Sequence, residues 1–274
     1  MTTEQPAKPR RKRPPPRIAE VVRVSQLTPY MVRVTLSGEN MKGFFSKGPA
    51  EHVRIYFPNE TMGVLTLPVE GPEGLDFPTD VDRLKSRAYT PRRWNAGANQ
   101  LDVDFVIRSE GPASAWAASV KAGDPAVVSG QPSGAYLPET DVDWYFILGD
   151  ETALPAIATL AEVFPAPMRV HAVIEVLDAD EEQELTSDAH LEVTWLHRGA
   201  EKELSGRLLV TAMREATLPE GGGRVWVSAE ASIMRDLRRN LLEDRGLERS
   251  RIRTQGYWKD GSLNHTDHDM GDDV

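Results

Sequence analysis

The chain of 274 residues carries a formal net charge of −10 and contains no cysteine. The length suggests two domains, since a domain has about 150 residues, and the acidic balance argues against general nucleic-acid binding. The lack of cysteine excludes disulfides, thiolate-bound iron–sulfur clusters and a cysteine nucleophile, so any redox chemistry must use an organic cofactor.

Both ends of the chain are charged and poor in apolar residues. Residues 1–17 are basic and proline-rich, and residues 262–274 are acidic. Neither segment can bury enough apolar surface to offset its ordering entropy, so we predict two disordered tails. Arg10-Arg11 resembles the start of a twin-arginine export signal, but Pro14-Pro15-Pro16 stands where an apolar segment should follow. No apolar run approaches the ~20 residues of a membrane span. We therefore expect a cytoplasmic monomer that binds neither nucleic acid nor membrane.

Residues 18–139 predict a β domain. Leu101–Phe105 alternates apolar and acidic residues, as a half-buried strand does. The domain contains several short runs rich in β-branched residues, which are separated by Gly, Pro and Asn. Short strands of this kind predict a sandwich or a barrel. Asn59–Asp82 is predicted to be a hairpin excursion or a long loop. The expected strands are Ile18–Ser25, Met31–Leu36, Val53–Phe57, Leu84–Thr90, Leu101–Ile107 and Ala126–Val128.

Residues 140–261 predict an α/β domain. Trp144–Leu148 is a continuous apolar run, typical of a strand covered on both faces. Strands and helices then alternate, which predicts right-handed crossovers and a mostly parallel sheet. The further strands are Val170–Val176, Leu191–Leu196, Val225–Ser228 and Ile252–Tyr257, and the helices are Ala153–Phe164, Arg207–Glu215 and Ser232–Arg245.

The first motif is Arg87-Ala88-Tyr89-Thr90-Pro91. Side chains alternate along a strand, so Arg87 and Tyr89 share one face. Tyr89 could stack on a flavin ring, Arg87 could pair with a pyrophosphate, and Thr90 could bond the ring edge. The alternative is a half-buried strand with an exposed arginine.

The second motif, Gly111–Ala117, follows a predicted strand. Pro112 suits the first position of a helix. The small residues after it would let a phosphate approach the N–H groups of the helix N-terminus. An ordinary strand–helix corner is the alternative.

The third motif, Gly149-Asp150-Glu151-Thr152-Ala153-Leu154-Pro155-Ala156, follows the buried strand. Ligands of open α/β sheets bind beyond the carboxyl ends of the strands, so a nicotinamide would lie at this turn. Asp150 could equally be a helix cap.

These motifs and the ending Gly256-Tyr257-Trp258-Lys259 occur in order. Together they resemble the siderophore-interacting protein family of NAD(P)H-dependent ferric-siderophore reductases, a branch of the ferredoxin-reductase superfamily. The resemblance covers roughly Ile18 to Gly261. It implies a Greek-key-like antiparallel β-barrel that binds FAD, followed by a mostly parallel α/β domain that binds NADH or NADPH, with the flavin ring between the two. The positions expected to bind the cofactors are Arg87, Tyr89, Thr90, Phe105, Ile107, Arg108, Gly111, Ala113, Ser114, Asp150, Thr152, Ala153, Glu230, Tyr257 and Trp258.

Two positions depart from the family pattern. Arg108-Ser109 replaces a usual His-Gly, which removes one flavin contact while Arg108 could add phosphate affinity. Ala229 stands where a glycine is usual before Glu230, and would narrow the approach to the nicotinamide.

The implied reaction suits a chain without cysteine, because flavin converts the two-electron hydride of NAD(P)H into the single electrons that ferric iron accepts. Anionic ferric siderophores would need a local basic patch on this acidic protein, and Lys259, Lys47 and Arg54 are the candidates. No catalytic side chain and no resident metal are expected. Two alternatives stay open: electron transfer to a protein partner or to free flavin, and a non-catalytic protein that binds FAD or siderophore. Arg235, Arg238, Arg239 and Arg245 could reach a 2′-phosphate or form a solvated helix face.

Overall fold

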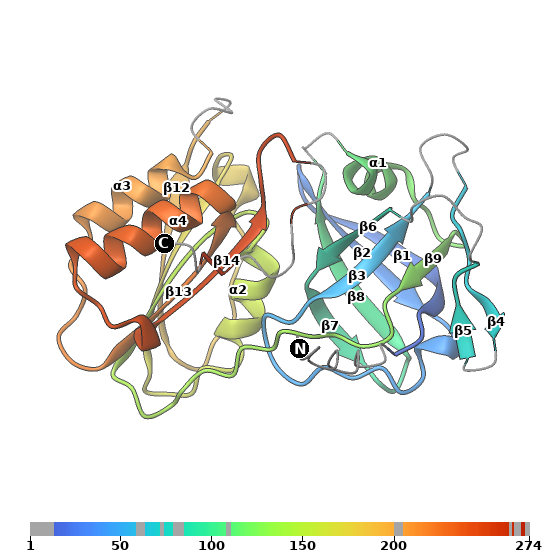
Figure 1. Ribbon diagram of the computed structural model, residues 1–274, viewed down its shortest axis with the longest axis horizontal. Helices are drawn as coiled ribbons and strands as arrows, with labels where there is room; N and C mark the ends of the chain where they lie inside the picture. The colour runs from blue at the N-terminus through green and yellow to red at the C-terminus, as the bar shows by residue number, and fades with distance from the viewer. Residues whose placement is uncertain are drawn as a thin grey trace, which may run out of the picture.

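The computed structural model describes residues 14–58, 64–71, 74–78, 85–107, 111–199, 205–262, 265 and 270–271. It has a curled antiparallel sheet at the N-terminal end of the chain and a parallel sheet with helices at the C-terminal end (Figure 1). The predicted fold class, a β-barrel domain followed by an α/β domain, is confirmed. Within the described ranges, no helix is both long and apolar enough to cross a membrane.

The N-terminal sheet has the strand order β6-β3-β9-β1-β2-β8-β7. Its strands are β1 (Arg17–Thr28), β2 (Met31–Ser37), β3 (Val53–Phe57), β6 (Lys85–Tyr89), β7 (Pro91–Asn95), β8 (Gln100–Val106) and β9 (Pro125–Val128). A 3-10 turn, η1 (Glu39–Met41), a hairpin, β4 (Val69–Gly71) and β5 (Gly74–Asp76), and one helix, α1 (Pro112–Ser119), complete this part.

The order of the strands requires this sheet to curl into a barrel. β6 and β7 are its two edge strands, yet only Thr90 separates them in the sequence. The edges must therefore meet at Thr90, which closes the core around Phe57, Phe105 and Trp116. Pro91, which cannot donate a ladder hydrogen bond, opens the edge strand β7.

The acidic face of β8 is buried rather than solvated. The alternation along this strand predicts exposed Asp102 and Asp104, but both are largely buried. The Arg33 guanidinium donates two hydrogen bonds to Asp104, at 2.6 and 2.8 Å, and the Thr35 hydroxyl donates to Asp102 at 2.6 Å. Partners on the neighbouring strand β2 therefore replace the water that the alternation predicts.

The C-terminal sheet is parallel, with the order β12-β11-β10-β13-β14. Its strands are β10 (Trp144–Asp150), β11 (Arg169–Val176), β12 (His190–His197), β13 (Gly223–Glu230) and β14 (Ile252–Trp258). The helices are α2 (Leu154–Ala161), α3 (Arg207–Glu215) and α4 (Ala231–Arg239). A π-helical segment, η4 (Asn240–Asp244), continues α4, and two 3-10 turns lie at Ala179–Glu181 (η2) and Arg249–Arg251 (η5).

Alternate residues of β10 pack on opposite faces of this sheet. Trp144, Phe146 and Leu148 lie in the core with α3 and α4, whereas Tyr145 and Ile147 lie in the core with α2. The sheet is therefore covered on both faces, as its continuous apolar run predicts.

The α2 side of the sheet also carries the contact with the barrel. Met31 and Ala50 of the barrel belong to the same core cluster as α2. Glu181 of η2 accepts hydrogen bonds from the Thr28 hydroxyl, at 2.5 Å, and from the Tyr30 N–H, at 2.9 Å. Apolar and polar contacts together hold the two domains against each other.

Several boundaries differ from the predictions. Arg17, assigned to the tail, opens β1 and donates a hydrogen bond to the Gly130 carbonyl at 2.5 Å. Met270, also assigned to a tail, accepts one from Thr254 at 2.6 Å, and Gly271 is buried. Arg238 is buried and donates to Thr254 at 3.2 Å, so it belongs to neither a solvated face nor a phosphate site.

Candidate functional site

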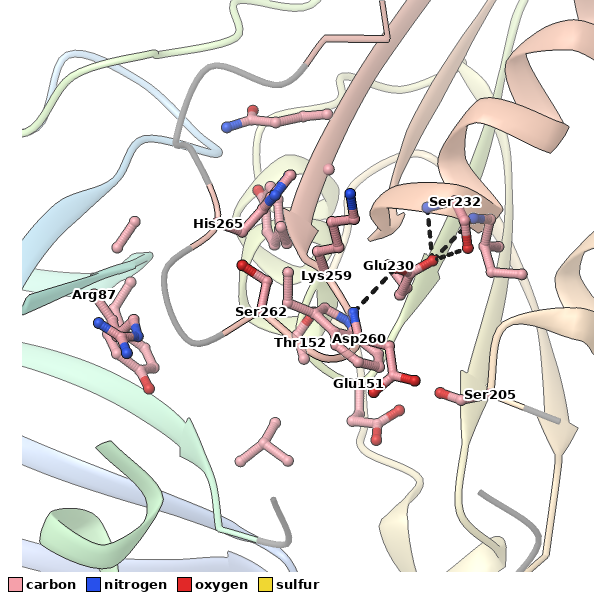
Figure 2. A pocket seen from close by; sticks show the side chains of 18 of the residues that line it. Arg87, Glu151, Thr152, Ser205, Glu230, Ser232, Lys259, Asp260, Ser262 and His265 are labelled. Carbon is pink, nitrogen blue, oxygen red and sulfur yellow. Dashed lines mark hydrogen bonds between the residues drawn. The ribbon is translucent and has the colours of Figure 1, made fainter. Parts of the chain in front are cut away.

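A cleft of about 1260 Å³ lies between the barrel and the parallel sheet. Figure 2 shows Arg87 on one side of it and Glu151, Glu230 and Lys259 on the other. The volume exceeds the roughly 300–1,000 Å³ of a typical single-ligand pocket, so there is room for more than one ligand. On the sheet side the cleft lies at the carboxyl ends of β10 and β13. The strand order reverses between these two strands, which is where open α/β sheets bind ligands.

Tyr89 forms an aromatic platform on the barrel side. Its ring packs against Phe105, with 4.3 Å between ring centroids, and against Phe57 at 6.3 Å, while it also lines the cleft. Burial raises the pKa of the Tyr89 hydroxyl far above its usual range, so the side chain is neutral. A supported, neutral, flat ring is suited to stacking on a flavin.

Two arginines from adjacent strands line the cleft beside this ring. Arg87 donates a hydrogen bond to the Ser86 carbonyl at 2.9 Å, and Arg54 donates from Nε to the Ser86 hydroxyl at 2.9 Å. Ser86 thereby orients both guanidinium groups. Planar guanidinium groups recognise phosphate and carboxylate oxygens, so this wall can bind an anion.

The N-terminus of α1 completes the barrel wall. Gly111 precedes the helix with φ +143°, a conformation that favours glycine, and no side chain caps the helix. Ala113 and Ser114 line the cleft in the first turn, where backbone N–H groups lack intrahelical acceptors. Such a helix start binds phosphate. With Arg87 and Tyr89 it fits a flavin dinucleotide.

Asp150 joins three strand ends behind the sheet wall. Its Oδ1 accepts a hydrogen bond from the Thr152 N–H at 2.9 Å, and its Oδ2 accepts from the Glu230 N–H at 3.1 Å and from Trp258 Nε1 at 2.8 Å. The residue is 1% exposed, and burial, followed by the charge of Glu151, raises its pKa to about 6. Asp150 therefore positions cleft residues instead of contacting a ligand.

Glu230 connects the start of α4 to the turn after β14. Its Oε2 accepts from the Ser232 and Ile233 N–H groups at 2.6 and 3.1 Å, and its Oε1 accepts from the Asp260 N–H at 3.2 Å (Figure 2). Burial opposes ionisation of Glu230, but a hydrogen bond from the Ser232 hydroxyl together with these N–H bonds outweighs it and lowers the pKa. The carboxylate is thus a helix cap that also holds the turn after Lys259 against the cleft.

Tyr257 lies near the end of β14 and lines the cleft. Burial raises the pKa of its hydroxyl to about 12, and the Ser228 and Thr90 hydroxyls oppose this shift. Thr90 lines the cleft from the barrel side, so the two residues face the same cavity.

The structure brings most of the predicted site residues to one cleft. The predicted residues that line it are Arg87, Tyr89, Thr90, Gly111, Ala113, Ser114, Thr152, Glu230, Tyr257, Trp258, Lys259 and Arg54. Arg108 lies outside the described residues.

Five predicted residues are not among those that line the cleft. Phe105 and Ala153 are wholly buried, and Ile107 packs against the barrel core. Asp150 lies behind the wall, as described above. Lys47 lies 5.9 Å from the Phe45 ring on a loop whose turn is held by Glu51. The Ala229 methyl is buried in the core with α3 and α4, so it does not narrow the cleft. Sequence spacing shows which residues are near a motif, but not which of them face the cavity.

Sequence reasoning missed the residues that α3 contributes. Arg207, Thr211 and Arg214 line the far end of the cleft, together with Ser205. Their i, i+4, i+7 spacing marks one helix face, and this spacing is the signal in the sequence that could have identified them.

Two family models together match most of the chain. Residues 20–136 match the siderophore-interacting FAD-binding domain, and residues 142–261 match the siderophore-interacting protein model. The chain belongs to the siderophore-interacting protein family. The resemblance drawn from its four motifs is therefore confirmed.

Individual relatives agree with this assignment. Ferric vibriobactin reductase ViuB of Vibrio cholerae is 28% identical, over 93% of both chains. The NADPH-dependent ferric-chelate reductase of Escherichia coli is 28% identical, over 87% of this chain and 91% of its own. The crystal structure of a siderophore utilization protein from T. fusca has 39% identity and a TM-score of 0.83, over 94% of this chain and 98% of its own. A ferredoxin NADP⁺ reductase from Neisseria gonorrhoeae, at 17% identity and a TM-score of 0.60, shares the fold.

Proposed function

We propose that this chain is an FAD-dependent oxidoreductase that passes electrons from NAD(P)H to a ferric siderophore. One observation carries the proposal: a single cleft joins a flavin-stacking ring and a phosphate-binding helix start to the switch point of a parallel sheet. The relatives named as ferric reductases support the same activity. The cytoplasm, where reduced nicotinamide is available, is the proposed location, and the monomer is the proposed working form.

FAD, when bound, supplies the conversion between a two-electron hydride donor and a one-electron ferric acceptor. The barrel wall holds it. Tyr89 stacks on the ring system, Thr90 bonds the ring edge, and Arg87 pairs with the pyrophosphate beside the α1 N-terminus. The protein forms no covalent bond in this scheme, and its contribution is binding and orientation.

The sheet wall holds the nicotinamide dinucleotide. Thr152 and Glu230 lie at the switch point, and Trp258 closes the wall with its indole held by Asp150. The far end of the cleft carries the cations Arg207 and Arg214. Since a 2′-phosphate is the charge that distinguishes NADPH from NADH, these two arginines favour NADPH.

The ferric chelate is the substrate. Arg54 and Lys259 line the cleft and supply positive charge, which an anionic chelate needs on a protein of net charge −10. Lys47 does not line the cleft, so the proposed patch consists of Arg54 and Lys259. Reduction releases the iron because hard oxygen donors hold ferric iron more tightly than ferrous iron.

An anaerobic visible spectrum tests the proposal. The purified protein should show bound FAD, bleach on addition of NADPH and recover its colour on addition of a ferric siderophore. Bound FAD that never bleaches would identify a binding protein, and bleaching without recovery would point to another electron acceptor. Failure to bind added FAD would contradict the assignment of the barrel wall.

A further inference from the structure

A buried charged group lies behind the far end of the cleft. Glu175 on β11 and Arg198 after β12 have side chains that are 0% and 1% exposed. The Arg198 guanidinium forms a bidentate pair with Glu151, which lines the cleft, and its Nη1 lies 3.5 Å from Glu175 Oε1. One guanidinium thus connects a cleft residue to a carboxylate in the interior.

Glu175 also holds the backbone of the cleft wall. Its Oε1 accepts a hydrogen bond from the Gly206 N–H at 2.5 Å. The neighbours of Gly206, Ser205 and Arg207, both line the cleft. Gly206 has φ +81°, and a Cβ there would lie 2.6 Å from Ile233 of α4. The segment therefore lies between the Glu175 carboxylate and α4, and its conformation and close approach to Ile233 require glycine at position 206.

This arrangement of buried charges destabilises the folded protein. Glu151 and Glu175 share the guanidinium of Arg198, and the charge of Asp150 acts on both Arg198 and Glu175. Burial, opposed by the Gly206 hydrogen bond and the charge of Arg198, raises the pKa of Glu175 to about 7. Among the described residues, Glu175 Oε2 and Arg198 Nε have no hydrogen-bond partner. A buried charge that is only partly paired destabilises a protein, so a purely structural role would be served better by apolar side chains.

We infer that Glu175 and Arg198 are positioning residues for the nicotinamide dinucleotide. They hold the segment Ser205–Arg207 and the Glu151 side chain in a fixed arrangement, and so determine the affinity for the nucleotide half of NAD(P)H without touching the reacting atoms. The inference rests on the proposed function, because it assigns the nucleotide to this end of the cleft.

The expected effect falls on binding and not on the chemical step. Without the Glu175 acceptor, Ser205–Arg207 populates its binding position for only part of the time, and the apparent dissociation constant rises in inverse proportion to that fraction. Interactions remote from the reacting atoms that act equally on ground and transition states change KM and leave kcat unchanged.

The test compares Glu175→Ala with Glu175→Gln in the FAD-loaded protein. We expect Glu175→Ala to weaken binding of NADP⁺ about tenfold, the size expected from one lost buried hydrogen bond. Hydrogen–deuterium exchange of the Ser205–Arg207 segment should accelerate, with FAD content and kcat at saturating NADPH unchanged. Glu175→Gln keeps an acceptor oxygen for Gly206 and should restore NADP⁺ binding to within about threefold. Glu192→Ala removes an exposed carboxylate from the neighbouring strand β12 and should change nothing.

Glu175→Leu serves as the second variant, because it removes the acceptor while filling the buried space. Unchanged NADP⁺ binding in the folded Ala and Leu variants would overturn the inference and leave the proposed function intact. Failure of both variants to fold would also overturn it, since Glu175 would then serve the fold alone. If neither NADH nor NADPH reduces the flavin of the wild-type protein, and the protein does not bind NADP⁺, both the inference and the proposed function are overturned.

Discussion

The two walls of the cleft are built in different ways. On the barrel side most working residues come from two short segments, and Arg54 of β3 joins them. Arg87, Tyr89 and Thr90 lie within four consecutive positions, and Gly111 to Ser114 form one helix start. On the sheet side the cleft residues come from the ends of different strands and are held by buried carboxylates behind them. Residues that are close in sequence can line a ligand site without further support. Residues from the ends of separate strands need buried charged groups, here Asp150 and Glu175, to hold them together.

The largest expected effect is the pH dependence of stability caused by the buried carboxylate of Asp150. Asp150 has its pKa raised from 3.8 to about 6 in the folded protein, so folding favours its protonated form. The stability of the wild type should therefore fall, relative to Asp150→Asn, as the pH rises from about 4 to about 6, by about 3 kcal/mol. Chemical denaturation of both proteins across this range measures the difference. If the free energies of unfolding of the two proteins change in parallel with pH, burial does not raise the pKa of Asp150. A constant difference between the two curves does not affect this conclusion.

The barrel wall should respond through FAD affinity. Arg87→Ala removes a charge-assisted contact with the pyrophosphate, which contributes about 2 kcal/mol, so FAD should bind about 30-fold more weakly. Fluorescence titration of the apoprotein with FAD gives the dissociation constant. Arg93→Ala, which removes an exposed arginine on β7, is the matched control and should bind FAD like the wild type. If the wild type, Arg87→Ala and Arg93→Ala bind FAD with equal affinity, Arg87 does not contribute to the flavin site.

The arginines of α3 should separate the two nicotinamide cofactors. Arg207→Ala and Arg214→Ala should each lower kcat/KM for NADPH about tenfold, because a cation near the 2′-phosphate is lost. The value for NADH should stay the same. Arg169→Ala, at the opposite end of the parallel sheet, controls for the change in net charge. A parallel loss with both cofactors would place these residues outside the 2′-phosphate site.

The smallest effect is expected at the flavin platform. Tyr89→Ala should weaken FAD retention by about 1 kcal/mol beyond the loss of buried area, because a stacking partner is removed. Tyr89→Phe keeps the ring on Phe105 and should retain FAD fully. The FAD-to-protein ratio after purification is the measurement, and an unchanged ratio in Tyr89→Ala would count against stacking.

Local signals predicted much of this molecule. The barrel strands, the alternating α/β elements and the order of the four motifs follow from apolar periodicity, β-branched runs and turn residues, which depend on near neighbours in the sequence. The same signals misjudged Asp102 and Asp104, whose partners Arg33 and Thr35 lie on another strand. They also overlooked Arg207 and Arg214, because nothing local shows that α3 lines the same cleft as the barrel motifs.

The sequence by itself therefore determined the two fold classes and the residues of the barrel wall. Strand and helix preferences are short-range properties, and Arg87, Tyr89 and Thr90 share one edge because they are nearly consecutive. Only the tertiary structure decided that Asp150 joins Glu230 and Trp258, and that Glu175 and Arg198 support Gly206. Those contacts join strands separated by whole crossovers, and the energy of a buried charge depends on partners that only the packed fold supplies.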